Sequence, residues 1–220
     1  MSEVRASLLI EERVPLADLT WWKVGGLAEF FCRPKTPDQV EEALQWVTKR
    51  GLHYHVLGGG SNVLISDRGV KGLVICLRDL VGVKEASDSQ RVRAEVLAGT
   101  PKAQLLKLFL SHQLAPAEFL SGLPGDVGGG VAMNAGVGEP ICPREFNEIV
   151  AEIEVFRPTP TGQIERLRFL HSQIQWGYRD SSGWQPGVLV RAWVSWPHSP
   201  DKELMNRVRK ATRVRRGKQP

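Results

Sequence analysis

The chain has 220 residues, of which 42% are hydrophobic and 24% are charged, as is usual for a globular protein. It contains no run approaching the roughly 18 apolar residues that a membrane-spanning helix needs, and its first residues lack the apolar stretch of a signal peptide. The three cysteines are widely spaced, which indicates reduced thiols, so we expect a cytoplasmic protein with no membrane partner.

The positive charge of the chain lies near its C-terminus. The net charge is +5, but residues 207–218 contain seven basic side chains and no acidic one, so removing them leaves a net charge of −2. We expect residues 198–220 to form a basic helix, opened by Ser199-Pro200-Asp201. A run of arginines can bind nucleic-acid phosphates. Because no aromatic residues are interleaved here, a solvated amphipathic helix, or a connector that touches a ligand phosphate, is favoured over a nucleic-acid partner.

In chain order, the first predicted elements are a strand and a helix. Residues 29–32 have a strand-like apolar pattern, and the helix that follows has Thr36 as its N-cap and ends at Gly51. Its apolar residues recur at the spacing of one helix face, namely Val40, Ala43, Leu44 and Val47. His53 and His55 then have the spacing of two ligands on one strand face. No cysteine or carboxylate pair stands nearby, so we predict no metal.

A glycine-rich loop comes next and is the segment around which the rest of the chain is organised. It begins at Leu57 and continues with Gly58, Gly59, Gly60, Ser61 and Asn62. Residues without Cβ let a ligand lie against the main chain, and amides exposed in such a turn suit a phosphate or diphosphate. Val63 stands where a dinucleotide fingerprint and a nucleophile elbow both require glycine. The alternative is a tight turn without a ligand.

Two strands and a second helix are predicted after this loop. Residues 73–77 form a continuous apolar run typical of a buried strand, and residues 92–98 alternate in the manner of a half-buried one. Thr100-Pro101 repeats the helix-start signal of the first helix. The apolar face of the second helix comprises Leu105, Leu106, Phe109 and Leu110.

Residues 118–138 are a second glycine-rich segment, with seven glycines in 21 residues and only two charges. A solvated linker would carry polar residues between its glycines. The interleaved Leu, Val, Ala and Met instead indicate a buried backbone that lies against a flat group. The alternative is a close contact between a helix and a sheet. The spacing from Gly125 to Gly130 is that of a phosphate-binding P-loop, but Val131 and Ala132 replace its lysine and hydroxyl residue.

From Ile149 onward the pattern is that of β-structure. Residues 149–155 and 163–169 are predicted to pair as a hairpin, and residues 188–196 form a further strand. Arg179 lies between these segments with aromatic residues before it. Its guanidinium can face an anionic substrate or a developing enolate. The alternative is a structural ion pair with a carboxylate such as that of Asp180.

Five segments, in the same order, resemble the UDP-N-acetylenolpyruvoylglucosamine reductases of bacterial peptidoglycan synthesis, the MurB family. They are residues 20–29 (T-W-W-K-V-G-G-L-A-E), 57–67 (L-G-G-G-S-N-V-L-I-S-D), 122–138, 178–181 (Y-R-D-S) and the basic helix that leads to Lys218-Gln219-Pro220. The resemblance covers essentially the whole chain. It implies a two-lobed α+β FAD-binding fold of the MurB and vanillyl-alcohol-oxidase (PCMH) type, not a Rossmann fold. The lobes would be residues 1–78 and 79–197.

The resemblance also implies the cofactors, the substrate and the site. In this family NADPH reduces FAD, and the reduced flavin reduces UDP-N-acetylglucosamine enolpyruvate to UDP-N-acetylmuramate. Gly58 to Asn62 would hold the diphosphate of FAD, and Arg179 matches the active-site arginine that stabilises the enol-like intermediate. The residues expected to line the flavin are Leu123, Pro124, Gly125, Gly128, Gly129, Ala132, Asn134 and Gly136.

The family pattern continues into a substrate-binding domain that has no counterpart among the 220 residues. That domain carries the serine that protonates the intermediate and a glutamate, and neither matches a position here. We therefore expect the flavin-binding part and one of three catalytic residues. The alternative to a reductase is an FAD-binding module without reductase activity of its own, whose substrate-binding domain is separate or missing.

Overall fold

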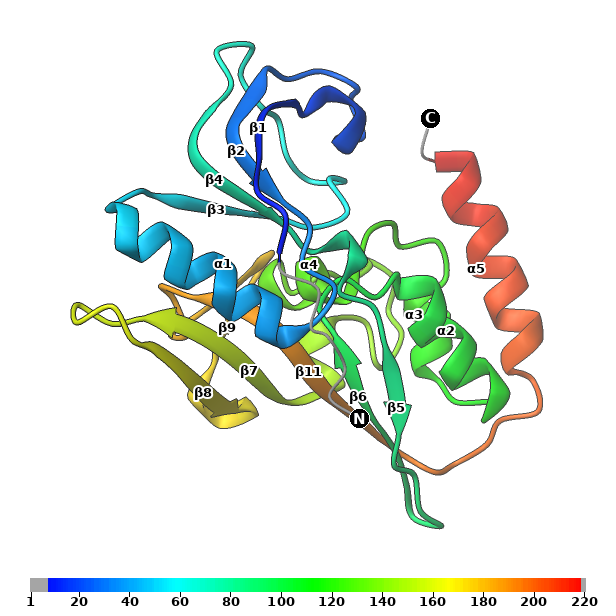
Figure 1. The fold of residues 1–220 in the computed structure, drawn as a ribbon. Coiled ribbons are helices and arrows are strands. Elements are labelled where there is room, and N and C mark those ends of the chain that lie inside the picture. The colour runs from blue at the N-terminus through cyan, green and yellow to red at the C-terminus, as the bar shows by residue number, and fades with distance from the viewer. Residues whose placement is uncertain (1–7, 219–220) are drawn as a thin grey trace, which may run out of the picture.

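The computed structural model describes residues 8–218, which form two β-sheets with helices between and beside them (Figure 1). The first sheet has the strand order β1-β2-β4-β3, with β1 antiparallel to β2 and the other neighbours parallel. Its strands are β1 (Glu11–Pro15), β2 (Leu27–Cys32), β3 (Tyr54–Leu57) and β4 (Val70–Cys76).

The second sheet is antiparallel throughout and has the order β5-β6-β11-β7-β8. Its strands are β5 (Val83–Glu85), β6 (Arg91–Leu97), β7 (Val150–Pro158), β8 (Ile164–Leu170) and β11 (Val188–Pro197). A separate hairpin consists of β9 (Gln175–Gly177) and β10 (Asp180–Ser182). The longer strands match the predicted segments to within a few residues, because their apolar positions alternate or run continuously as expected.

The helices connect and cover the two sheets. They are α1 (Pro37–Arg50), α2 (Lys102–Ser111), α3 (Pro116–Leu120), α4 (Val127–Ala132) and α5 (Leu204–Lys218). Four 3-10 turns are also present: η1 (Ala17–Leu19), η2 (Leu77–Asp79), η3 (Phe146–Glu148) and η4 (His171–Gln173). The turn η2 joins the last strand of the first sheet to the second sheet. The division into lobes at residues 78 and 79 stays a prediction.

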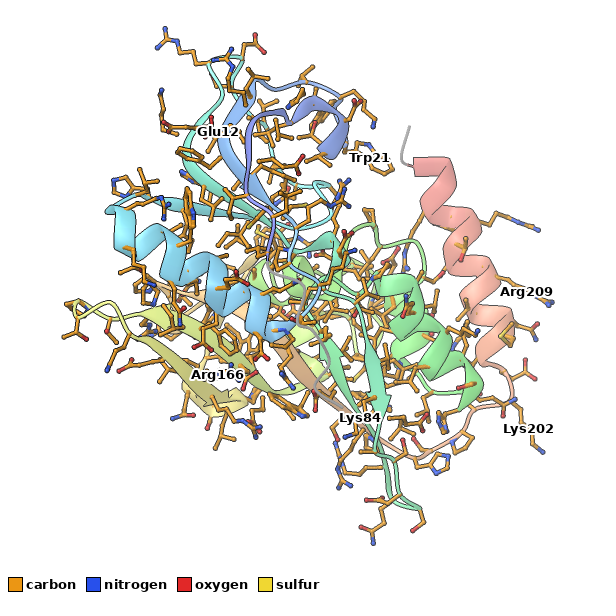
Figure 2. All side chains as sticks on the ribbon, viewed as in Figure 1. Glu12, Trp21, Lys84, Arg166, Lys202 and Arg209 are labelled. Atoms are coloured by element: carbon orange, nitrogen blue, oxygen red, sulfur yellow. The ribbon has the colours of Figure 1, made fainter. Side chains whose placement is uncertain are left out.

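Helix α1 lies between the two sheets (Figure 1). The Thr36 side chain accepts a hydrogen bond from the Gln39 amide, and Gly51 ends the helix in the left-handed conformation with φ 63°, as predicted. The buried face of α1 belongs to one hydrophobic cluster that also contains residues of β4, β6, β7 and β11. On the outside, Arg166 of β8 binds the carboxylates of Asp38 and Glu41 on α1 (Figure 2).

Two of the predicted helix starts are wrong. Thr100 does not cap α2, because its hydroxyl binds the backbone of Gly82 at both the amide and the carbonyl, and Pro101 takes the N-cap position. Helix α5 begins at Leu204 rather than near Ser199. Asp201 instead binds the Glu203 amide and the Arg207 side chain. In both cases the side chain expected at the start of the helix makes other hydrogen bonds, which compete with capping of the helix.

Helix α5 is held to the body of the protein by a buried arginine. Arg215 is 7% exposed, and its guanidinium donates to the carbonyl oxygens of Glu118, Phe119 and Ser121 and to the Glu139 carboxylate. Leu204 and Val208 bury the apolar side of the same helix. The C-terminal basic segment is therefore partly a structural element and not only a solvated face.

Replacing Arg215 by methionine is expected to lower the free energy of unfolding by about 2–4 kcal/mol, because several carbonyls lose a charged donor. Urea unfolding followed by circular dichroism measures this change. Arg213→Met, on the exposed side of the same helix, is the control and should change stability by less than about 0.5 kcal/mol. Equal effects of the two substitutions would contradict a structural role for Arg215.

Candidate functional site

The two glycine-rich segments meet where the first sheet joins α4. A Cβ on Gly58 would lie 2.7 Å from Oδ2 of Asp126, and one on Gly59 would lie 3.0 Å from the Cα of Gly125. Ser61 is on the same wall, since its Oγ would be 2.8 Å from a Cβ on Gly125. We call residues 58–62 with residues 123–126 the cradle. The structure thus brings together two segments that are far apart in the sequence.

Arg78 fixes the orientation of the peptide groups in the cradle. Its Nη2 donates to the carbonyls of Leu19 (2.7 Å) and Gly59 (2.8 Å), and its Nε donates to the carbonyl of Gly58 (3.4 Å). The carbonyl of Gly60 in turn accepts from the amide of Trp21 at 2.9 Å. Carbonyls 58 to 60 are therefore all held by donors of the protein.

In a trans peptide the amide points away from the carbonyl that precedes it. Because the carbonyls of Gly59 and Gly60 are turned toward Arg78 and Trp21, the amides of Gly60 and Ser61 point to the opposite side. Within residues 8–218, the amides of Gly60, Ser61 and Asn62 and the side chains of Ser61 and Asn62 make no hydrogen bond. The two amides on the side away from Arg78 and Trp21, with the neighbouring donors of Ser61 and Asn62, are an arrangement that suits an anion.

Two buried charged residues lie at the cradle, Asp126 within it and Lys102 next to it. Lys102 is 5% exposed and Asp126 is 4% exposed. The Lys102 Nζ donates to the carbonyl of Pro124 at 2.8 Å, while Asp126 caps α4 by accepting from the Gly129 amide at 2.9 Å. Burial lowers the pKa of Lys102 to about 8, although the Asp126 carboxylate acts in the opposite direction. Burial raises the pKa of Asp126, while the Gly129 and Gly59 amides and Lys102 lower it.

Several glycines of the second segment are required by packing within the protein. A Cβ on Gly128 would lie 2.9 Å from that of Ala98, one on Gly130 would overlap the Phe146 ring, and one on Gly136 would overlap Glu145. The alternative of a close helix contact therefore accounts for these three positions. By contrast, a Cβ on the exposed Gly129 would meet only Asp126. The flavin-lining role of Gly128, Gly129 and Gly136 stays a prediction.

Three further predicted site residues have partners within the protein. Leu57 is 4% exposed and its side chain packs in the core of the first sheet. The Asn134 side chain donates to the Gly177 carbonyl and accepts from the Asn147 amide, so it links α4 to the β9–β10 hairpin. The carbonyl of Ala132 accepts from the Ser181 hydroxyl of the same hairpin. The predicted contact of these three residues with the flavin stays a prediction.

Arg179 lies at the turn of the β9–β10 hairpin. It is exposed, adopts φ 55°, and its guanidinium carbon lies 5.4 Å from the centre of the Tyr178 ring. Its charge contributes to lowering the pKa of Lys102. No ion pair joins it to Asp180 within residues 8–218. Of the two interpretations of Arg179, the geometry favours an exposed cation at the site.

Sequence reasoning missed Arg78, Lys102 and Asp126. Asp126 had a detectable signal, since Asp followed by a small-residue segment is typical of a helix N-cap. Arg78 and Lys102 had none, because each acts on backbone groups that are distant in the sequence. Trp21 lies at the margin of the first sheet (Figure 2), and it and Trp22 are 68% and 67% exposed. Within the described part of the chain, no group of three potential ligands is placed to hold a metal ion, and no helix is long and apolar enough to cross a membrane.

These residues fit the diphosphate of FAD. The cradle offers unpaired amides and hydroxyl and amide side chains, and Arg78 and Lys102 supply positive charge near the carboxylate of Asp126. Residues 125 and 126 lie opposite Gly58 and Gly59. A Cβ at either glycine would contact them and would fill the space next to the main chain.

Comparisons with known proteins identify the family of the chain. A family model described as an FAD binding domain matches residues 28–168. The chain is 31% identical to UDP-N-acetylenolpyruvoylglucosamine reductase of Lactobacillus helveticus (strain DPC 4571), over 96% of this chain and 67% of that protein. It spans less than two thirds of the length of similar reductases from Synechococcus and Prochlorococcus.

Two solved structures show the same fold. UDP-N-acetylenolpyruvylglucosamine reductase (MurB) from Thermus caldophilus superposes with a TM-score of 0.72 at 29% identity, over 97% of this chain and 71% of that one. Cholesterol oxidase from Brevibacterium sterolicum gives a TM-score of 0.62 at 13% identity, over 90% of this chain and 39% of that one. The predicted two-lobed α+β fold of the FAD-binding type is thereby confirmed.

Proposed function

Because the chain belongs to the FAD-binding-domain family and to the UDP-N-acetylenolpyruvoylglucosamine reductases, the MurB family, we propose that it serves the FAD-dependent reduction of UDP-N-acetylglucosamine enolpyruvate. The product would be UDP-N-acetylmuramate, a precursor of peptidoglycan. NADPH would be the reductant, and the cytoplasm would be the compartment. The UDP-linked substrate is the proposed small-molecule partner.

The single observation that carries this proposal is the orientation of the cradle. Its carbonyls are held by Arg78 and Trp21, and its amides at Gly60 to Asn62 have no acceptor within residues 8–218. A tight turn without a ligand has no use for three donors that converge on one side. A diphosphate would satisfy these donors and the side chains of Ser61 and Asn62.

The remaining chemistry is assigned as follows. FAD, when bound, would accept hydride from NADPH and deliver it to the enolpyruvyl double bond. Arg179 would stabilise the negative charge that develops on the carboxylate side of the substrate, because its guanidinium is exposed and keeps its donors free of a carboxylate partner in the described part of the chain. Gln175 to Ser182 would hold Arg179 in place through the contacts of Ser181 and Gly177 with α4.

The test is an anaerobic flavin experiment on the purified protein, reconstituted with FAD. We expect NADPH to bleach the oxidised-flavin absorbance, and UDP-N-acetylglucosamine enolpyruvate to restore it with the formation of an equal amount of product. NADH serves as the matched comparison for the choice of reductant. Failure to bind FAD after reconstitution would overturn the proposal.

A second candidate function is favoured by the share of the relatives that the chain covers. The chain spans 41% of one curated relative and 63% of another, so the activity of the whole relative is a proposal for this chain. An FAD-binding module without reductase activity of its own would be reduced by NADPH but not reoxidised by the substrate. That outcome of the same experiment would replace the first candidate by the second.

A further inference from the structure

The carboxylate of Asp126 lies at the proposed anion site, where a second negative charge is unfavourable. A Cβ on Gly58 would lie 2.7 and 2.9 Å from its two oxygens, so the carboxylate is in contact with the wall that is proposed to hold the FAD diphosphate. Asp126 is 4% exposed, and its Oδ2 makes no hydrogen bond to the described residues. An uncompensated buried carboxylate at this place would repel a diphosphate.

Lys102 is a buried cation on the same side of the cradle, and its charge lowers the pKa of Asp126 without a direct ion pair between the two side chains in residues 8–218. It projects from the first turn of α2, is 5% exposed, and its only side-chain hydrogen bond within residues 8–218 is from Nζ to the Pro124 carbonyl at 2.8 Å. An ammonium group has three donors, so two remain for other acceptors. The Nζ would lie 3.7 Å from a Cβ on Gly125, which puts it on the same wall of the cradle as Asp126.

The other neighbours of Lys102 do not neutralise Asp126. Phe146 of η3 offers only its ring, 5.7 Å from Nζ. Glu118 of α3 is bound by Arg207 of α5. Arg179, at the β9–β10 turn, acts on Lys102 as a like charge and lowers its pKa. Lys102 is therefore the buried cation placed to compensate Asp126.

We propose that Lys102 is the charge-compensating residue of the cradle, whose ammonium group cancels the Asp126 carboxylate and so permits the FAD diphosphate to bind against Gly58 to Asn62. The proposal rests on the proposed binding of FAD. Lys102 is a positioning residue for the anion rather than a catalytic one. Its removal should weaken FAD binding mainly because Asp126 is left unpaired.

A double-mutant cycle on the full chain tests this role. At pH 7, Lys102→Met is expected to raise the FAD dissociation constant at least about tenfold, a conservative value for a charge this close. Asp126→Asn keeps the acceptor that caps α4 and should bind FAD at least as tightly as the wild type. The FAD dissociation constant of the double variant should lie within about threefold of the wild-type value. Lys107→Met, on the exposed side of α2, is the matched control. The readout is flavin fluorescence on titration with FAD.

The pH dependence gives a second readout that a purely structural role would not produce. Since the pKa of Lys102 is lowered to about 8, the ammonium form is complete well below pH 8 and is lost as the pH rises through that value. FAD affinity of the wild type should therefore fall between about pH 7 and 9.5, and the double variant should lack this fall. Circular dichroism of each apo variant verifies folding. If Lys102→Met misfolds, Asp126→Asn alone remains decisive, because weaker binding by that variant would overturn the proposal.

Two outcomes contradict the proposal while leaving FAD binding intact. One is that Lys102→Met binds FAD as tightly as Lys107→Met does. The other is that Asp126→Asn fails to rescue Lys102→Met, which would mean that Lys102 acts through the Pro124 loop and not through charge. Absence of FAD binding by the wild type would instead overturn the proposed function, and this inference with it.

Discussion

Replacing Arg78 by methionine is expected to raise the FAD dissociation constant about 100-fold or more. The guanidinium holds the carbonyls of Leu19, Gly58 and Gly59, and hydrogen bonds from a charged donor are worth about 1.5–3 kcal/mol each. Without them the peptide groups of the loop are free to rotate, and the row of amides that faces the ligand is lost. Equilibrium titration with FAD measures the effect, and about 2.7 kcal/mol corresponds to a factor of 100.

Arg33→Met is the matched control for Arg78→Met. Arg33 is also near η2, but it makes a surface ion pair with Asp79 and its side chain is 42% exposed. Such pairs contribute about 0–1 kcal/mol, so this variant should bind FAD within a factor of three of the wild type. The FAD dissociation constant of Arg78→Lys should be close to that of Arg78→Met, because an ammonium group cannot span the same three carbonyls. Wild-type affinity in Arg78→Met would contradict the orienting role.

Replacing Arg179 by asparagine is expected to lower the rate of flavin reoxidation by the enolpyruvate substrate at least about 100-fold, the usual cost of removing a group that stabilises developing charge. FAD affinity should change less than threefold. Asparagine is chosen because Arg179 has φ 55°, and asparagine accepts this conformation more readily than most residues. Stopped-flow absorbance after reduction by NADPH gives the rate.

The control for Arg179→Asn comes from the first sheet. Arg13 is another exposed arginine with a positive φ, at 54°, and it lies in β1. Arg13→Asn therefore reproduces the change in charge and backbone preference at a distance from the cradle, and should leave the rate unchanged. A rate in Arg179→Asn equal to that of Arg13→Asn would remove Arg179 from the mechanism. Arg179→Lys separates charge from the planar, bidentate geometry of guanidinium.

The sequence predicted elements whose signals are local. Helix α1 has its cap, its apolar spacing and its terminal Gly51 within one segment, and all of them were confirmed. The alternation of residues in β6 and β11 likewise identified their buried faces. Thr100 shows the limit of this approach. Its hydroxyl is bound by Gly82, a partner 18 residues away that no helix-capping rule contains.

The sequence predicted the first glycine-rich loop of the candidate site, but it did not resolve the roles of the second glycine-rich segment. The glycines at positions 58–60 are unusual enough to indicate an anion site, and the structure places them against Gly125 and Asp126. The seven glycines of the second segment were ambiguous, because a missing Cβ serves a ligand and a neighbouring helix equally well. The structure distinguishes the two cases, because Gly130 packs against Phe146 whereas Gly129 is exposed.

The position of α1 has a consequence for how the protein unfolds. Its buried residues, with Leu73 and Ile75 of the first sheet, share one hydrophobic cluster with the strands of the second sheet, while the cluster confined to the first sheet contains six buried residues. The first sheet therefore has only a small core of its own and packs its other buried residues into the cluster of the second sheet. We expect a single cooperative melting transition, and binding of FAD should raise the melting temperature of the whole protein.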